Sequence, residues 1–252
     1  MINVKERLRA SGIHLCLSLL VALLAAVLVF AVWYPYPYRQ ISGGRELFLL
    51  VVTVDVLMGP LITLMVFNRN KPRSELRRDL ATVGVLQVAA LAYGLWTVAL
   101  ARPVHLVFEI DRFRVVHAVD VPDELLDRTP PQIVALPWSG PTMLAVRPFR
   151  DAGESSDATL AALQGLQIGA RPDLWQPYSQ ARPAVRQIAK PVTQLKTRFK
   201  KWSGEIDRVL SSAGRRADAT AYVPVVGRNS FWTAFVDPAT ADVVGFIPLD
   251  PF

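Results

Sequence analysis

Residues 51–67, VVTVDVLMGPLITLMVF, place a carboxylate inside an otherwise apolar stretch. Asp55, Gly59 and Thr63 recur every four residues, which puts them on one face of a helix. An acid in such a stretch can take part in a proton relay, form a structural hydrogen bond, or contact another membrane protein. A relay normally needs several intramembrane ionisable groups and more spans, so it is the weakest of the three. The other two interpretations stay open.

Two further polar features accompany Asp55. Pro60 frees the backbone carbonyl of Val56, so we expect a bend beside the acid. Gln87 belongs to another apolar run, and its level differs from that of Asp55 by about 7–8 Å when counted from the run ends. That offset is awkward for a direct hydrogen bond, although helix tilt or a bridging water could close it. With no lysine or arginine deep in any run, we expect Asp55 to be protonated, since a lone carboxylate is disfavoured in lipid.

A second set of chemically interesting side chains follows in residues 105–117. The set is His105, Glu109, Asp111 and His117. They share one face of a strand, but twelve residues of straight strand span about 40 Å, so we expect no metal site. The sequence has no nucleophile elbow, zinc-protease, phosphate-loop or dinucleotide pattern. Cys16 is the single cysteine, which excludes an intrachain disulfide. We therefore expect no enzyme activity and no cofactor.

Three apolar runs must position Asp55 and Gln87, at about 13–32, 47–67 and 80–101. Each is about 20 residues long, enough to cross a bilayer as a helix. The first run is too long for a cleaved signal peptide, so we expect an uncleaved anchor. Small and polar residues share one face of each run, which is typical of close helix packing. On the flanking runs these are Ser18, Ala22, Ala25 and Ala26, then Gly84, Gln87, Leu91 and Gly94. We predict a three-transmembrane-helix domain over residues 13–101.

Basic residues predict the orientation of these spans. Eight of the ten lysines and arginines before position 102, Arg69 among them, lie in the N-terminal flank and in the 68–79 segment. The positive-inside rule makes residues 1–12 cytoplasmic and residues 102–252 periplasmic, in the inner membrane. Residues 1–101 supply +5 of the net charge of +7. The basic excess is therefore topogenic, and nucleic acid is not an expected partner.

The periplasmic part, residues 102–252, shows the pattern of an α+β domain with a small antiparallel sheet. Residues 103–116 predict one long strand and 137–149 a shorter one. Residues 156–168 predict a helix capped by Ser156 or Asp157, and 181–214 predict helices broken near Pro191 and Gly204. The C-terminal residues predict three strands joined by the turns GRNS and DPATAD. Phe231 and Trp232 suit either a core or a strand edge that accepts a partner.

A cluster of basic residues lies in the helical part of this domain, at Lys196, Arg198, Lys200 and Lys201. Such a cluster is typical of a solvated helix face. Lipid head groups and an acidic partner remain alternatives.

Four phrases in order resemble the type IV pilin accessory proteins of the TfpX/TfpZ family. They are RLRASGIHLCLSLLVALL, GGRELFLLVVTVDVLMGPLITLMVF, SELRRDLATVGVLQVAALAYGL and ARPVHLVFEIDRFRVV. The resemblance covers roughly residues 5–120, and the later domain matches in general character. It implies an inner-membrane accessory factor that promotes pilus assembly or surface display of a pilin. It implies no catalytic residues.

Two hypotheses from different classes follow. The first is a pilin-specific chaperone whose spans dock the pilin's membrane helix while its periplasmic domain touches the pilin head. Its other expected partners are the pilus assembly machinery and membrane lipid. The alternative is a membrane sensor with a periplasmic ligand-binding domain, which the short cytoplasmic segments disfavour. The partner-contact candidates are Asp55, Gly59, Pro60, Thr63, Gln87, Phe231 and Trp232.

Overall fold

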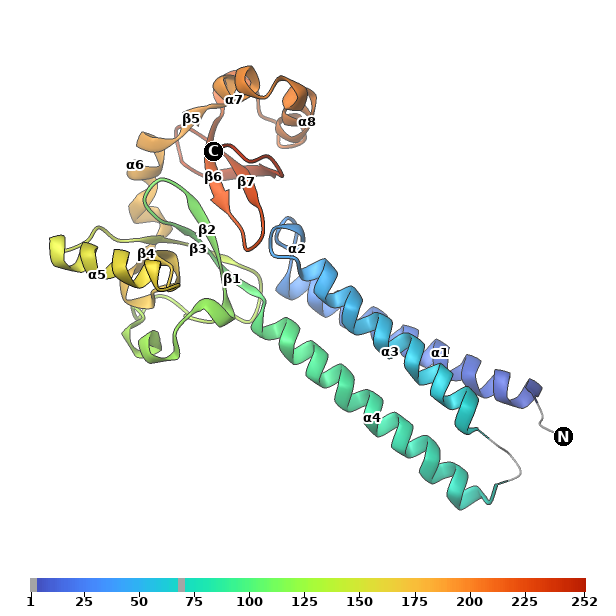
Figure 1. The fold of residues 1–252 in the computed structure, drawn as a ribbon. Helices are drawn as coiled ribbons and strands as arrows, with labels where there is room; N and C mark the ends of the chain where they lie inside the picture. Colours follow the sequence, from blue (N-terminus) through green and yellow to red (C-terminus); the bar gives the residue numbers. More distant parts are fainter. Residues whose placement is uncertain (1–3, 68–70) are drawn as a thin grey trace. The chain divides into compact units, whose positions relative to one another are not determined.

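The structure is a computed structural model that describes residues 4–67 and 71–252 (Figure 1). It divides into two compact units. One holds the chain up to residue 35 together with 44–101, and the other holds 36–43 together with 102–252.

Three helices in the described residues are long and apolar enough to cross a membrane, as predicted. They are α1 (Val4–Val27) with its π-helical extension η1 (Leu28–Trp33), α3 (Gly44–Val66) and α4 (Arg73–Leu100). All three begin earlier than expected, at Val4, Gly44 and Arg73. The largest extensions are those of α1 and α4, because their basic flanks are good helix formers and continue the helix beyond the apolar run. Part of the 68–79 segment is thus the start of α4, and Arg69 lies outside the described residues.

α3 is the central helix of this unit and packs along both α1 and α4. At one end, the buried Tyr34 donates a hydrogen bond of 3.0 Å from its hydroxyl to the carbonyl of Val98. Gly44 leaves the space that the Tyr34 ring fills, since a Cβ at Gly44 would overlap it. Phe30 and Phe48 pack edge to face, 5.0 Å between ring centres. The predicted three-helix architecture is confirmed.

The second unit is an α+β domain built on an eight-stranded sheet in the order β4-β3-β1-β2-β6-β7-β8, with β5 beside β6. The α+β class is as predicted, but the sheet is larger than expected. It is also mixed, because β1 runs parallel to β3 and β2 parallel to β6. The strands are β1 (Pro103–Phe108), β2 (Phe113–His117), β3 (Thr142–Val146), β4 (Trp175–Pro177), β5 (Lys190–Pro191), β6 (Ala221–Val226), β7 (Phe231–Val236) and β8 (Val243–Ile247).

Helices cover both faces of this sheet. α6 (Tyr178–Ile188) packs on one face, in the core that includes Val223. α5 (Ala152–Leu163) packs in a second core, and α7 (Val192–Arg198) and α8 (Ser203–Ser212) pack against Tyr222 in a third. Neighbouring residues of β6 thus enter different cores, as the period-two alternation of a strand requires.

The single strand predicted for 103–116 is wrong, because the chain turns back at Glu109 and forms the β1–β2 hairpin. The Glu109 amide donates to the carbonyl of Arg112 at 2.9 Å and closes the turn. The Glu109 carboxylate also pairs with Arg114 at 2.7 Å. Asp111 is the one turn-favouring residue among Glu-Ile-Asp-Arg, which include no glycine, proline or asparagine, so the turn signal is weak.

The other predicted elements are closer to the structure. The three terminal strands and both of their turns are confirmed. The break at Pro191 is confirmed as well, whereas the second break falls at Phe199–Trp202 and leaves Gly204 inside α8. Helix α5 starts earlier than predicted because Asp151 is its cap, accepting a hydrogen bond of 2.8 Å from the Glu154 amide.

Residues 36–43, between the first two long helices, belong to the core of the α+β domain. They form the short helix α2 (Tyr38–Ile41), and both of its end residues are buried among sheet residues. The Tyr38 ring packs edge to face on Phe246, 6.0 Å between centres. Gly227 leaves room for Ile41, since a Cβ at Gly227 would overlap the Ile41 side chain. The domain is therefore assembled from two separate stretches of chain.

We predict that Ile41→Ala destabilises the α+β domain by about 2–5 kcal/mol, because Ile41 is 1% exposed and its removal leaves a cavity. The neighbouring Gln40→Ala is the matched control, since Gln40 is exposed. Thermal unfolding of the full chain in detergent, followed by near-ultraviolet circular dichroism, measures the effect. Equal midpoints for the two variants would contradict the inclusion of residues 36–43 in this core.

His105 is a buried histidine on β1 whose ring is fixed on both sides. Its Nδ1 lies 2.7 Å from the Thr142 hydroxyl and its Nε2 lies 2.8 Å from the Ala135 carbonyl. The Ala135 oxygen can only accept, so Nε2 carries the proton and Nδ1 accepts from Thr142. Burial lowers the pKa of His105 to about 4, while the bond to Ala135 opposes the shift.

Because the pKa of His105 is lower in the folded chain than in the unfolded chain, stability decreases as the pH decreases. The unfolded chain binds the extra proton between about pH 6.5 and pH 4, so stability present above this window is lost as the pH falls through it. The loss amounts to about 3 kcal/mol at most. We predict that His105→Gln, which does not titrate, flattens this part of the stability–pH curve. Identical pH dependence of unfolding in the original chain and in His105→Gln would refute the lowered pKa of His105.

Candidate functional site

Gln87 of α4 joins all three long helices through its amide group. Its Nε2 donates to the backbone carbonyl of Asp55 at 3.1 Å and more weakly to Asp55 Oδ1 and Ser18 Oγ, both at 3.4 Å. Its Oε1 lies 2.5 Å from Nε2 of His14. One side chain therefore bridges α1, α3 and α4, which is how polar groups are satisfied inside a membrane bundle.

His14 extends this network toward Thr63. The His14 Nδ1 lies 2.5 Å from the Thr63 hydroxyl. Because Gln87 Oε1 can only accept, His14 donates from Nε2 and accepts from Thr63 at Nδ1. The result is a continuous chain of hydrogen bonds from Thr63 through His14 and Gln87 to Asp55.

The predicted offset in depth between Asp55 and Gln87 is wrong. Asp55 lies eleven residues before the end of α3, and Gln87 lies fourteen residues after the start of α4. These positions differ by only about 4–5 Å along the helix axes, and the long Gln87 side chain covers that difference. The error arose because the helices do not end where the apolar runs end.

Gly59 and Pro60 lie beside this network and have steric and backbone roles. A Cβ at Gly59 would overlap the Gln87 amide, so the absence of a side chain at Gly59 lets the Gln87 side chain of α4 pack against α3. Ser11 donates to the carbonyl of Pro60 at 2.9 Å. Helix α3 runs through Pro60 as one assigned element, and the predicted bend stays a prediction.

The network forms one side of a groove of about 190 Å³ between α1 and α4. Asp55 of α3 and the polar atoms of His14, Ser18 and Gln87 line it together with apolar side chains. The apolar and small lining residues are Leu17, Val21, Gly84, Val88 and Leu91. Among the described residues, the second carboxylate oxygen of Asp55 has no hydrogen-bond partner. The groove thus offers an unused polar contact within apolar surroundings.

The structure separates the two predicted candidates on β7. Trp232 is 4% exposed and belongs to the sheet core, where its Nε1 donates to Ser230 Oγ at 3.1 Å. Its side chain is therefore not available to a partner. Phe231 is 47% exposed and packs edge to face on Phe252, 5.4 Å between centres. The idea of β7 as an open edge is wrong, because β6 and β8 flank it.

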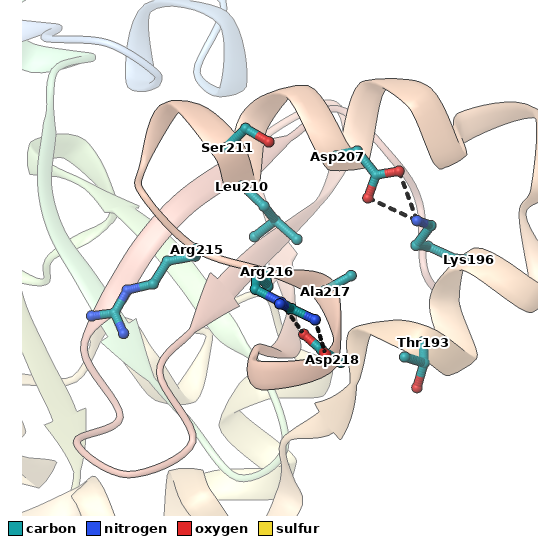
Figure 2. A pocket seen from close by; sticks show the side chains of 9 residues that line it. All are labelled: Thr193, Lys196, Asp207, Leu210, Ser211, Arg215, Arg216, Ala217 and Asp218. Carbon is teal, nitrogen blue, oxygen red and sulfur yellow. Dashed lines mark hydrogen bonds and ion pairs between the residues drawn. The ribbon is translucent and has the colours of Figure 1, made fainter.

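The α+β domain has a surface hollow of about 540 Å³ between α7, α8 and the following turn (Figure 2). The charged side chains that line it are paired: Lys196 with Asp207, Arg216 with Asp218, and Arg215 with Asp237, each at 2.7 Å. Paired surface charges make this hollow a weak candidate for a charged ligand.

Half of the basic cluster noted in the sequence is also engaged. Lys196 pairs with Asp207, and Arg198 donates to the carbonyls of Pro251 and Phe252. Lys200 and Lys201 are exposed.

The histidines of the β1–β2 hairpin are used within the domain. His117 Nδ1 lies 2.9 Å from Asp120, and His105 has the two partners given above. Over the described ranges, no group of three or more histidine, cysteine, aspartate and glutamate side chains is placed to hold a metal ion.

Sequence reasoning missed His14 and Ser11. Gln87 was expected as the nearest polar group to Asp55, and lysine and arginine as its possible charged partners, but histidine was not. Ser11 precedes the predicted start of the first span, and His14 is the second residue of that span. Helical spacing offered a signal, since Ser11, His14 and Ser18 follow one another at three- and four-residue intervals. That spacing continues to the small residues at Ala22 and Ala25.

Three long apolar helices followed by a helix-and-sheet domain define a membrane-associated protein of α+β class. The family model for the fimbrial assembly protein FimB matches residues 2–43. No solved structure matches the chain.

Curated relatives match far more of the chain. The fimbrial assembly protein of serogroup I from Dichelobacter nodosus is 36% identical over 250 residues, which cover 97% of this chain and 95% of the relative. That of serogroup E1 is 34% identical over 249 residues, with the same coverage. That of serogroups C1 and C2 is 43% identical over 122 residues, 48% of this chain and 91% of the relative. The chain belongs to this family of fimbrial assembly proteins, and the predicted kinship with type IV pilin accessory proteins is confirmed.

We predict that Gly59→Ala destabilises the helical unit by about 1–3 kcal/mol, because the new methyl group displaces the Gln87 amide. Gly84→Ala is the matched control, since a Cβ at Gly84 meets nothing within 4 Å. Unfolding of the purified chain by dodecyl sulfate in mixed micelles reports the difference. A midpoint for Gly59→Ala equal to that of Gly84→Ala would show that Gln87 does not depend on this glycine.

Proposed function

We propose that this protein is a membrane accessory factor, a chaperone that promotes assembly or surface display of a cognate type IV pilin. Curated relatives that match nearly the whole chain carry the name fimbrial assembly protein, which supports a role in fimbrial assembly. The observation that carries the finer proposal is the groove with Asp55 at its floor.

The groove suits an apolar helix that presents one polar group. Its walls come from α1 and α4, which both pack on α3, so an occupant would complete the layer above α3. Leu17, Val21 and Val88 offer apolar contact, and Gly84 permits close approach of a helix backbone. A hydrogen-bond acceptor on the occupant would satisfy the open oxygen of Asp55, which carries the proton in the neutral acid. A pilin held by one apolar helix before it enters the fibre, as the family resemblance implies, has the required form.

The proposed location is the inner membrane, with the α+β domain in the periplasm. Basic residues flank the cytoplasmic ends of the spans in the proposed orientation. The packing of residues 36–43 in the domain core supports one part of this arrangement. This packing requires the loop after the first span and the domain after the third span to lie on the same side of the membrane. Three spans meet this requirement, because the second and third together return the chain to the side that the first one reaches.

The α+β domain is proposed to contact the pilin head, and Phe231 is its exposed candidate. The role is proposed to be non-enzymatic, with the pilus assembly machinery as a further partner and no nucleic acid involved. The network around Asp55 supports this, because its described members bind one another and hold three helices together.

We predict that Asp55→Asn retains surface pili and Asp55→Leu strongly reduces them. Asparagine keeps a hydrogen-bonding group of nearly the same shape at the groove floor, whereas leucine removes it. Electron microscopy and a surface-pilin immunoassay measure piliation, and immunoblotting of the accessory protein checks that each variant accumulates normally. Unchanged piliation with Asp55→Leu at normal protein levels would reject the polar contact.

Photo-crosslinking in living cells tests occupancy directly. A photoreactive residue at Val88, on the groove wall, is expected to capture the pilin, and one at Leu86, on the opposite face of α4, is not. A third probe at Phe231 tests the contact with the pilin head. Capture from Leu86 as efficient as from Val88 would show that the groove is not the docking site.

A further inference from the structure

The segment 130–141, PPQIVALPWSGP, follows the 3-10 helix Asp123–Arg128, leads into β3 and carries no charged residue. It contains no assigned helix or strand. Its apolar side chains alternate between two sides. Ile133 and Ala135 pack against the domain core. The intervening Val134, Leu136 and Trp138 are exposed, by 68%, 36% and 63%.

The exposed side of this segment, formed by Val134, Leu136 and Trp138, is an apolar edge whose backbone is hydrogen-bonded to His105 of β1 and to Arg102, just before β1. The Ala135 carbonyl accepts from the buried His105 on β1 at 2.8 Å. The Pro137 carbonyl accepts from Nε and Nη2 of Arg102, both at 3.4 Å. The Arg102 guanidinium also lies over the Trp138 ring, 6.0 Å from its centre. The backbone of this segment is therefore anchored, while the side chains of Val134, Leu136 and Trp138 point outward and stay exposed in the folded domain.

Chain connectivity indicates what covers them. Arg102 is the second residue after Leu100, the last residue of α4, so it lies within about 7 Å of the end of that helix along the chain. Because α4 is long and apolar enough to span a membrane, Arg102 lies at the level of the lipid head groups. Tryptophan and arginine are the side chains that settle at this level, with an apolar body toward the acyl chains and a polar end in water.

A similar pair occurs where the chain passes into the domain from the first span. Tyr36 is 59% exposed, and the Arg39 guanidinium lies over its ring at 5.6 Å. Tyr36 follows η1, which ends at Trp33, by three residues. At each of the two places where a span leads into the α+β domain, the chain thus carries an exposed aromatic ring with an arginine over it.

We infer that the edge formed by Val134, Leu136 and Trp138 inserts into the interfacial layer of the bilayer next to the third span. The partner of this surface is lipid. The edge fixes the α+β domain against the membrane at a second place besides its covalent connections. This contact is independent of the groove between α1 and α4 and of any pilin.

The test uses the full chain with Cys16→Ala, so that a single introduced cysteine carries an environment-sensitive nitrobenzoxadiazole label. Val134→Cys and Leu136→Cys place the label on the edge, and Leu163→Cys is the matched control. Leu163 is apolar, 80% exposed and at the end of α5 in the same domain. Each labelled protein is reconstituted in vesicles of phosphatidylcholine and phosphatidylglycerol, with or without nitroxide-bearing lipid. Near-ultraviolet circular dichroism checks that each variant is folded.

We expect blue-shifted emission at 134 and 136 and quenching by nitroxide lipid several times stronger than at 163. Quenching by lipid separates insertion from self-association, because a protein partner also shifts the emission but excludes the nitroxide. Two results would overturn the inference. One is emission at 134 and 136 that is as intense in nitroxide-bearing vesicles as in nitroxide-free vesicles. The other is quenching at 163 as strong as at 134 and 136.

Discussion

The membrane unit depends on the satisfaction of one amide, that of Gln87. Polar groups inside a bilayer have no water to bind, so each must bind a partner within the protein. A group without a partner destabilises the fold by several kcal/mol. Gln87 has a donor and an acceptor end, and it uses the donor end on α3 and the acceptor end on α1. The space for it comes from Gly59, and the position of His14 is fixed from the other side by Thr63. Removing any member leaves another without its partner.

This arrangement gives Asp55 two roles that the sequence could not separate. Its backbone carbonyl and one carboxylate oxygen belong to the bundle through Gln87, while its other oxygen is open toward the groove. A structural hydrogen bond and a contact for a partner are therefore compatible in one residue. The structural hydrogen bond to Gln87 stabilises the bundle, and the open oxygen of Asp55 is the group that a docking helix would contact.

Local patterns predicted most of the architecture. The three spans followed from run length, and the terminal strands followed from the glycine- and aspartate-containing turns beside them. The misses have physical causes. The turn at residues 109–112 contains one turn-favouring residue, Asp111, and is also stabilised by the ion pair of Glu109 with Arg114, so its composition resembles that of a strand. The parallel pairing of β2 with β6 joins residues more than one hundred positions apart, which no local pattern reports. His14 was missed because its importance depends on Gln87, 73 residues away.

The incorporation of residues 36–43 into the domain core has a consequence for how the protein is made. Tyr38 and Ile41 are synthesised before two further spans, and the strands that bury them come last. During that interval the short helix α2 has no sheet to pack on, so the domain closes only after the last strands have left the ribosome. For the same reason the domain is not a module that evolution or an engineer can exchange by a single cut. A functional chimaera between two relatives would have to take the eight-residue loop and the C-terminal segment from the same parent.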